Sequence, residues 1–173
     1  TSSLNCEIEL ICLISEVLNE LNLSDHTIMI NNRKILSALI DHCNSSMYFS
    51  KITVIIDKLD KIGVDKVIQE LQESIPIKEC SLLFKELFNV NYSDTNIFNW
   101  LENKLENNDE GQKGLKELNH IVNLSKELGI DNLEFNISLA RGLDYYTGSI
   151  FEVVLNNSSM GSIVGGGRYD NLT

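Results

Sequence analysis

Proline, histidine and paired cysteines are scarce in this sequence. Its 173 residues include one proline, three histidines and four cysteines, while 43% are hydrophobic. This composition is typical of a globular chain and excludes collagen-like and disordered classes. Cys6, Cys12, Cys43 and Cys80 form no C-x-x-C pair and have no metal-ligand spacing with a histidine. We therefore expect reduced, mostly buried thiols, a cytoplasmic location and no metal bound by protein ligands.

Basic charge is also scarce. The formal net charge is −11 at pH 7, and residues 1–75, 76–130 and 131–173 carry −5, −3 and −3. Because binding to a phosphate backbone requires Lys and Arg, this charge argues against a general nucleic-acid surface. Any surface that neutralises phosphates is expected to be local or to lie outside this segment.

A leader and a long apolar run are missing as well. The sequence has no charged-then-apolar N-terminal stretch and no apolar run of about eighteen residues, so nothing in it predicts secretion or a membrane span. The first residue is Thr1, and the sequence stops at Leu172-Thr173, where a helix is expected to begin. We therefore expect it to be a piece of a longer protein.

Apolar residues at helical spacing predict seven helices. They cover residues 6–23, 33–43, 47–61, 66–75, 79–88, 95–106 and 110–128. The third is ambiguous, because the β-branched run at 53–56 also fits a strand, but Phe49, Ile52 and Leu59 keep a helical spacing. Trp100, in the sixth helix, is expected to be a core residue.

Capping and stop residues punctuate these helices. The expected N-caps are Asn31 or Asn32, Asp65, Asp94 and Asp109. The expected stops are Gly63, Pro76 and Gly129. Glu7 and Glu9 fall in the first turn of the first helix, where carboxylates complement the helix dipole. We favour that role over a catalytic pair.

Alternating and β-branched segments predict a small sheet. Strands are expected at 27–30, 133–139 and 149–155, and a further strand begins within 161–164. The short polar connector at 156–159 predicts an antiparallel hairpin between the last two strands. The fold class is therefore expected to be α+β.

Residues 138–172 concentrate Arg, Tyr, Asp, Thr and Gly in patterns that a packed core does not need. One group is expected at a single sheet end, just before a strand: Arg141, Asp144, Tyr145, Tyr146 and Thr147. Gly165, Gly166 and Gly167 are expected to follow the last strand, where glycine permits a ligand to approach closely. Plainer interpretations exist: a loose turn for the glycines, half-buried packing for the tyrosines and a surface charge for Arg141.

The two blocks RGLDYYTG (141–148) and GGGRYDNL (165–172) together resemble the two histidine-specific signatures of class II histidyl-tRNA synthetases. They occur in the family's order and are separated by one hairpin. Weaker support comes from NNRKIL at 31–36 and IDKLDK at 56–61, which are similar to family segments upstream of the signatures. The resemblance spans the whole chain, although residues 62–130 contribute little to it.

This resemblance implies a partial class II synthetase-type antiparallel sheet with flanking helices and an inserted all-α subdomain. Residues 1–58 and 130–173 are then expected to belong to the catalytic core. Residues 59–129 are expected to form the helical insertion, which in this family approaches the acceptor arm of the tRNA.

The resemblance also implies a function: ATP-dependent activation of histidine to histidyl-adenylate, and its transfer to tRNA(His). Arg141 matches the arginine that stabilises the α-phosphate, since a guanidinium suits developing phosphate charge. Tyr145, Tyr146 and, with weaker support, Tyr169 match the histidine pocket, where hydroxyls give directional bonds to imidazole. Gly165, Gly166 and Gly167 would form a floor without side chains. Supporting roles are expected for Asp144, Thr147, Arg168 and Asp170.

Parts of a complete synthetase are missing from these residues. The only arginines are Arg33, Arg141 and Arg168, and no F-R-x-E motif is present. Class II motifs 1, 2 and 3 are therefore expected outside the segment, which alone should make no adenylate. The parent enzyme is expected to be a homodimer that uses ATP with Mg²⁺, and exposed sheet edges of the segment invite self-association.

Two other classes of function compete with the enzyme. A non-catalytic relative that serves as a regulatory or histidine-sensing module would keep the fold, but such relatives tend to lose the arginine or the tyrosines, and here Arg141, Tyr145 and Tyr146 are all present. A plain helical interaction protein would leave the triple glycine and the RGLDYYTG block unexplained.

Overall fold

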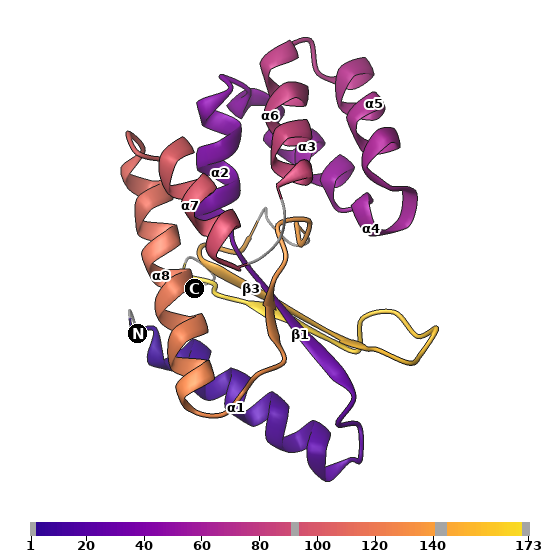
Figure 1. Cartoon of the computed structure of the whole chain (residues 1–173), viewed down its shortest axis with the longest axis vertical. Coiled ribbons are helices and arrows are strands. Elements are labelled where there is room, and N and C mark those ends of the chain that lie inside the picture. The colour runs from indigo at the N-terminus through magenta and orange to yellow at the C-terminus, as the bar shows by residue number, and fades with distance from the viewer. Residues whose placement is uncertain (1–2, 91–93, 141–144, 171–173) are drawn as a thin grey trace.

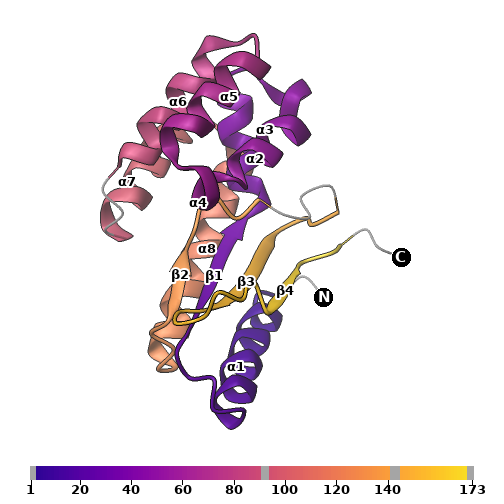
Figure 2. The same ribbon diagram turned by 90° about the vertical axis from the view of Figure 1, so that its right-hand side faces the viewer.

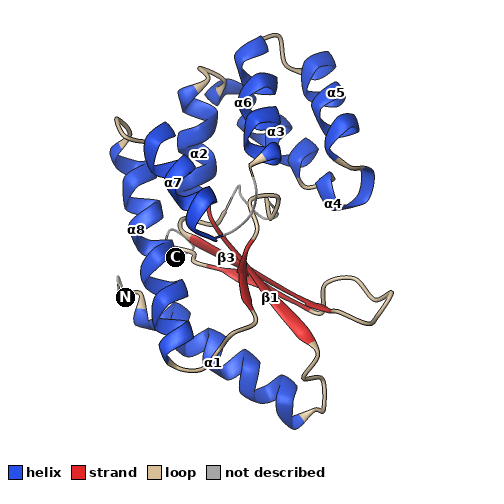
Figure 3. Cartoon of the chain, in the orientation of Figure 1, coloured by secondary structure: helices blue, strands red, loops and turns tan. Residues whose placement is uncertain are grey.

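The fold is described from a computed structural model, which covers residues 3–90, 94–140 and 145–170. Figure 3 distinguishes its helices from its strands. The helices are α1 (Asn5–Glu20), α2 (Arg33–His42), α3 (Phe49–Ile56), α4 (Leu59–Ile62), α5 (Val64–Ser74), α6 (Lys78–Asn89), α7 (Asp94–Lys104) and α8 (Asp109–Glu127), with a 3₁₀ turn η1 at Ser46–Tyr48. The strands are β1 (His26–Asn32), β2 (Leu133–Phe135), β3 (Ser149–Leu155) and β4 (Val164–Gly167).

The four described strands form one mixed sheet in the order β2-β1-β3-β4 (Figure 2). β1 and β3 pair antiparallel along their full lengths, from His26 opposite Leu155 to Asn32 opposite Ser149. β4 pairs antiparallel with β3, and only the short β2 runs parallel to β1. Together with the helices, this sheet confirms the expected α+β class.

One face of the sheet is apolar and covered by helices. Ile28 and Ile30 of β1 lie opposite Val153 and Phe151 of β3, so these four side chains share a face, and all are buried. α1 and α8 lie together on one side of the sheet (Figure 2), and α8 packs against β1 and β2. Burial of this face forms the core beneath the sheet.

The remaining helices gather beyond one end of the sheet (Figure 1). α5 packs against α3 and α6, while α8 packs against both α2 and α7. The expected division into residues 1–58, 59–129 and 130–173 stays a prediction. α8 belongs to the range 59–129, yet it contacts the sheet and α1 as well as α2 and α7.

The helix expected at 47–61 is in fact two helices. α3 ends at Ile56 and α4 begins at Leu59, with Asp57 and Lys58 between them. The β-branched run that closes α3 is a weak helix former, so little opposes a break there. Lys58 also turns its ammonium toward Glu70 of α5, with 2.6 Å between Nζ and Oε2.

Two residues that were expected to be N-caps are not the N-caps of their helices. Asn108, not Asp109, caps α8, because its Oδ1 accepts a hydrogen bond from the Gly111 amide at 2.9 Å. α5 begins directly after Gly63, which has φ of +80°, so Asp65 lies in the first turn and not at the cap. Asn32 caps α2 as predicted. The Asp94 side chain lies outside the described residues. Gly129 follows α8 with φ of +81°.

Three expected strands have different bounds. The first, expected at 27–30, is β1 and runs from His26 to Asn32. β2 stops at Phe135, and not at Leu139, because the Asn136 side chain accepts hydrogen bonds from the Ser138 amide and hydroxyl and turns the chain. The last strand begins at Val164, and the three glycines belong to it instead of following it. Trp100 is half-buried and packs against the core, and its Nε1 donates to Glu86 at 2.9 Å.

Two further expectations concern thiols and membranes. Cys43 and Cys80 are buried, whereas Cys12 is half-buried and Cys6 is exposed, and all four are free thiols. A hydrogen bond with Cys80 lowers the pKa of Cys43 to about 7, and the same bond raises that of Cys80. Across the described ranges, none of the helices is both long and apolar enough to span a bilayer.

Candidate histidine site

The floor of the candidate site is the glycine-only part of β4. A Cβ at Gly167 would lie 2.6 Å from Cδ1 of Tyr146 and 2.8 Å from the Ser149 carbonyl oxygen, so only glycine lets the tyrosine ring rest there. A Cβ at Gly165 or Gly166 would meet no atom within 4 Å. The three glycines therefore differ: one supports a ring, and two face open space.

Three tyrosines from the two signature blocks meet above this floor. Ring centroids are 4.5 Å apart for Tyr145 and Tyr146, 4.8 Å for Tyr146 and Tyr169, and 5.3 Å for the stacked rings of Tyr145 and Tyr169. Tyr146 is 8% exposed, whereas Tyr145 is 51% exposed. Burial, followed by hydrogen bonds with Tyr169 and Tyr145, raises the pKa of Tyr146 well above its ordinary value. Its hydroxyl is therefore protonated and can donate a hydrogen bond at neutral pH.

A cavity of about 250 Å³ adjoins the tyrosines. It is lined by Leu139, Tyr145, Tyr146, Ile150, Phe151, Glu152, Ser162, Gly165 and Gly166. Glu152 is 9% exposed and lies opposite Gly165 in the register of β3 and β4. A cavity that combines phenolic hydroxyls, a carboxylate and an open glycine floor can hold a small polar ring with hydrogen-bonding nitrogens.

Glu152 was not among the residues predicted from sequence. A signal for it was present, because it is the one charged residue in the otherwise apolar or small strand SIFEVVL. Strand alternation puts Glu152 on the face opposite Phe151, away from the helices. A buried carboxylate on a sheet face without covering helices marks a site more often than a core.

The second block is anchored to α1 by an ion pair. Arg168 Nε and Nη2 donate to the two carboxylate oxygens of Glu7 at 2.5 and 2.7 Å, and Nη2 also donates to the Ser3 carbonyl at 2.9 Å. Glu7 is buried, so this bidentate pair is largely shielded from solvent. Glu7 therefore has a structural partner that its expected role at the helix dipole did not reveal. The carboxylate raises the pKa of Arg168 above its ordinary value.

Thr147 and Asp170 tie the two blocks together. The Thr147 amide donates to the Arg168 carbonyl at 2.8 Å, and the Thr147 hydroxyl donates to Asp170 Oδ2 at 2.6 Å. Arg168 Nη1 lies 3.3 Å from Asp170 Oδ1. The hydrogen bond from Thr147 and then the interactions with Arg168 lower the pKa of Asp170. Arg141, Gly142, Leu143 and Asp144 lie outside the described residues.

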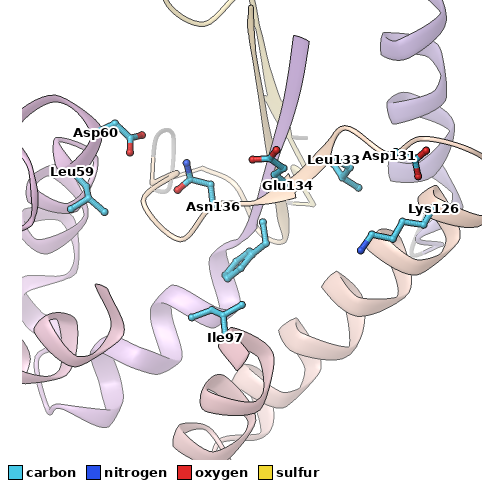
Figure 4. Close-up of a pocket in the computed structure, with 9 residues that line it drawn as sticks. Leu59, Asp60, Ile97, Lys126, Asp131, Leu133, Glu134 and Asn136 are labelled. Atoms are coloured by element: carbon cyan, nitrogen blue, oxygen red, sulfur yellow. The ribbon is translucent and has the colours of Figure 1, made fainter. Parts of the chain in front are cut away.

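A larger cavity of about 590 Å³ separates α4 from the edge of the sheet (Figure 4). Its lining comes from four helices or strands and the adjoining loops: Leu59, Asp60, Ile97, Lys126, Asp131, Leu133, Glu134, Phe135 and Asn136. The carboxylates come from separate segments and do not converge. In the described part of the chain, no three His, Cys, Asp or Glu side chains gather in a metal-binding group. These residues therefore give no support for a Mg²⁺ site within the segment.

Comparison with known proteins places this geometry in a family. The sequence profile described as histidyl-tRNA synthetase matches residues 1–173. The histidine–tRNA ligase of Cytophaga hutchinsonii is 41% identical over 175 residues, which cover all of this chain and 39% of that protein. The histidine–tRNA ligase of Azobacteroides pseudotrichonymphae is 43% identical over 175 residues, covering 100% of this chain and 38% of that protein.

Solved structures agree. A crystal structure of histidyl-tRNA synthetase from Nostoc matches with a TM-score of 0.89 and 30% identity, covering 99% of this chain and 42% of that one. A Bacillus halodurans protein described as an ATP phosphoribosyltransferase regulatory subunit/histidyl-tRNA synthetase shares the fold, with a TM-score of 0.80, 18% identity and coverage of 98% and 44%. The chain spans about 39% of the length of the first of these curated relatives. Its fold is of the class II synthetase type, and the chain belongs to the histidyl-tRNA synthetase family.

Proposed function

We propose that the protein containing these residues is a histidine–tRNA ligase, which activates histidine with ATP and transfers it to tRNA(His). The observation that carries the proposal is the small cavity in which Tyr145, Tyr146 and Glu152 surround the open floor of Gly165 and Gly166. The enzyme is proposed for the whole protein, because the chain covers 39% of its curated relative.

The imidazole of the substrate is proposed to lie over Gly165 and Gly166. The protonated hydroxyl of Tyr146 donates a hydrogen bond to an unprotonated ring nitrogen, and Tyr145 and Tyr169 bound the ring from the solvent side. Glu152 accepts a hydrogen bond from a substrate N–H group, which a buried carboxylate does strongly. Amino acids with aliphatic side chains cannot form these hydrogen bonds with Tyr146 and Glu152, and this gives the site its specificity.

The remaining predicted residues keep their proposed roles. Arg141 is proposed to stabilise the charge that develops on the α-phosphate during adenylate formation. Asp144, Thr147, Arg168 and Asp170 are proposed to support the pocket; the bonds of the last three join the two blocks and α1. Residues 59–129 are proposed to be the helical insertion that approaches the tRNA.

The class II motifs 1, 2 and 3 are proposed to lie outside residues 1–173, so the segment alone should form no adenylate. The parent protein is proposed to use ATP with Mg²⁺ and to be a homodimer. In the isolated segment, the edges of β2 and β4 invite pairing between copies. A cytoplasmic location is proposed because the four thiols are free.

The proposal is tested by histidine-dependent exchange of pyrophosphate into ATP, catalysed by the full-length protein. Exchange with histidine and with no other amino acid is expected. Arg141→Ala is expected to abolish exchange in a folded protein, and Tyr146→Phe is expected to raise the KM for histidine. A folded protein that binds histidine without exchange would instead identify a regulatory or histidine-sensing module.

A further inference from the structure

The loop that leads into the first signature block has a defined shape. It runs from Asn136 to Leu139, between the end of β2 and the segment that begins at Arg141. The Asn136 amide donates to the Ile30 carbonyl at 2.9 Å, and the Leu139 amide donates to the Asn136 carbonyl at 3.1 Å. Asn136 Oδ1 accepts from the Ser138 amide at 2.9 Å. The loop thus closes on itself and is attached to β1.

Asn31 provides the buried attachment. Its side chain is fully buried, and its Nδ2 donates to the Ile137 carbonyl at 3.2 Å and to the Leu139 carbonyl at 2.9 Å. Its Oδ1 accepts from the Asn32 amide at 2.8 Å. One side-chain amide therefore makes three hydrogen bonds, two of them to a loop more than a hundred residues away in sequence. Aspartate would lack the donor, and serine has only one donor to offer.

This attachment adjoins the candidate histidine site. Leu139 lines the small cavity, and so does Ile150, which lies opposite Asn31 in the pairing of β1 and β3. Asn31 itself is not among the residues that line this cavity. Its position therefore suits a residue that sets the shape of the site without touching the substrate.

A second attachment comes from the helical region and is weaker. Ser138 Oγ lies 3.3 Å from Asp60 Oδ2 of α4, and Figure 4 shows Asp60 and Asn136 at the same end of the larger cavity. This bond is long for a hydroxyl and a carboxylate. The loop is consequently held mainly from β1, through Asn31.

We propose that Asn31 is a positioning residue for histidine activation: it fixes the loop 136–139 and thereby Leu139, which lines the small cavity together with Tyr145 and Tyr146. The inference rests on the proposed function and deepens it. If Asn31 only stabilised the fold, its replacement would lower the unfolding temperature without changing the kinetic constants for histidine relative to those for ATP.

The test compares Asn31→Ser with Asn32→Ser in the full-length protein. Asn32 is the matched control, because it is the adjacent buried asparagine and serine can still cap α2. In pyrophosphate exchange, Asn31→Ser is expected to lower kcat/KM for histidine roughly tenfold, since a small displacement of reacting groups is costly. The KM for ATP should stay within about twofold, and Asn32→Ser should change neither value beyond about twofold.

Hydrogen exchange of backbone amides supplies a readout that needs no catalytic activity. In the wild-type protein, the amides of Ser138 and Leu139 are expected to exchange slowly, and Asn31→Ser but not Asn32→Ser should accelerate them. Fast exchange of these amides in the wild type would overturn the proposal. The proposal would also be overturned if the two variants changed kcat/KM for histidine, relative to the KM for ATP, by equal factors. If the wild type shows no histidine-dependent pyrophosphate exchange, the proposed function fails. The hydrogen exchange of the Ser138 and Leu139 amides then decides alone whether Asn31 holds the loop.

Discussion

On the sheet face that α1 and α8 cover, β1 and β3 present Ile28, Ile30, Phe151 and Val153. On the opposite face, the same two strands present Asn31 and Glu152. The covered face is stabilised by burial of apolar surface, which is not directional. The opposite face depends on hydrogen bonds and close approaches, which fail when single atoms are displaced. The same strands thus separate a stabilising face from a face suited to bind a ligand.

The covered face should be the more sensitive to loss of volume. Ile30→Ala is expected to lower the free energy of unfolding by about 4 kcal/mol, because Ile30 is fully buried and truncation leaves a cavity. Thr27→Ala is the control on the opposite face of the same strand; it removes a hydrogen bond to Asn156 and should cost about 1 kcal/mol or less. Urea unfolding of the full-length variants measures both, and equal losses would contradict the distinction between the faces.

The ion pair between Glu7 and Arg168 joins α1 to the second signature block of the candidate histidine site. Glu7→Gln removes the buried carboxylate that pairs with the half-buried Arg168 and leaves the exposed Asp170 as its carboxylate partner, so we expect a loss on the order of 2 kcal/mol. The KM for histidine should also rise, because Arg168 precedes Tyr169. Exposed Glu9 on the same helix provides the control, and Glu9→Gln should leave both stability and KM unchanged. Thermal unfolding and pyrophosphate exchange separate the two effects; a stable Glu7→Gln protein with normal KM would argue against the anchor.

Alanine substitutions in β4 distinguish the glycine that supports the Tyr146 ring from the glycines that form the floor of the cavity. Gly167→Ala is expected to lower the free energy of unfolding by about 2 kcal/mol, because the new Cβ would meet the Tyr146 ring and the Ser149 carbonyl oxygen. Gly165→Ala meets no atom and should change stability by less than about 0.5 kcal/mol. It should nevertheless raise the KM for histidine by narrowing the cavity. A Gly165→Ala enzyme with unchanged KM would mean that the substrate does not lie over this residue.

Sequence periodicity predicted the covered face well. The bounds of β3 at 149–155 and the start of α2 at Arg33 match the expectation, because alternation and capping are local signals. Helix breaks were harder to predict, since the division between α3 and α4 depends on contacts with α5. The strand at β4 was misplaced because three glycines read as a turn when the pairing with β3 is unknown.

The polar face was predicted only in part. The two signature blocks indicated that Tyr145, Tyr146 and Tyr169 belong together, and the structure brings their rings into contact. The bond between Glu7 and Arg168 spans 161 positions, so no local pattern could reveal it. The two bonds from Asn31 to the loop span 106 and 108 positions. Such contacts depend on sheet topology, which neither composition nor spacing specifies.

The smallest expected effect concerns Asp170, whose side chain is half exposed. Its pKa is lowered by the hydrogen bond from Thr147 and by Arg168, so its contribution to stability is present above the ordinary Asp pKa and is lost as the pH falls through the lowered value. Asp170→Asn should therefore cost less than about 1 kcal/mol at pH 7, given the exposure to solvent, and less still at acidic pH. Urea unfolding at both pH values measures the difference, with exposed Asp131→Asn as the control. A cost that grows on acidification would show that Asp170 opposes, and does not support, the junction of the two blocks.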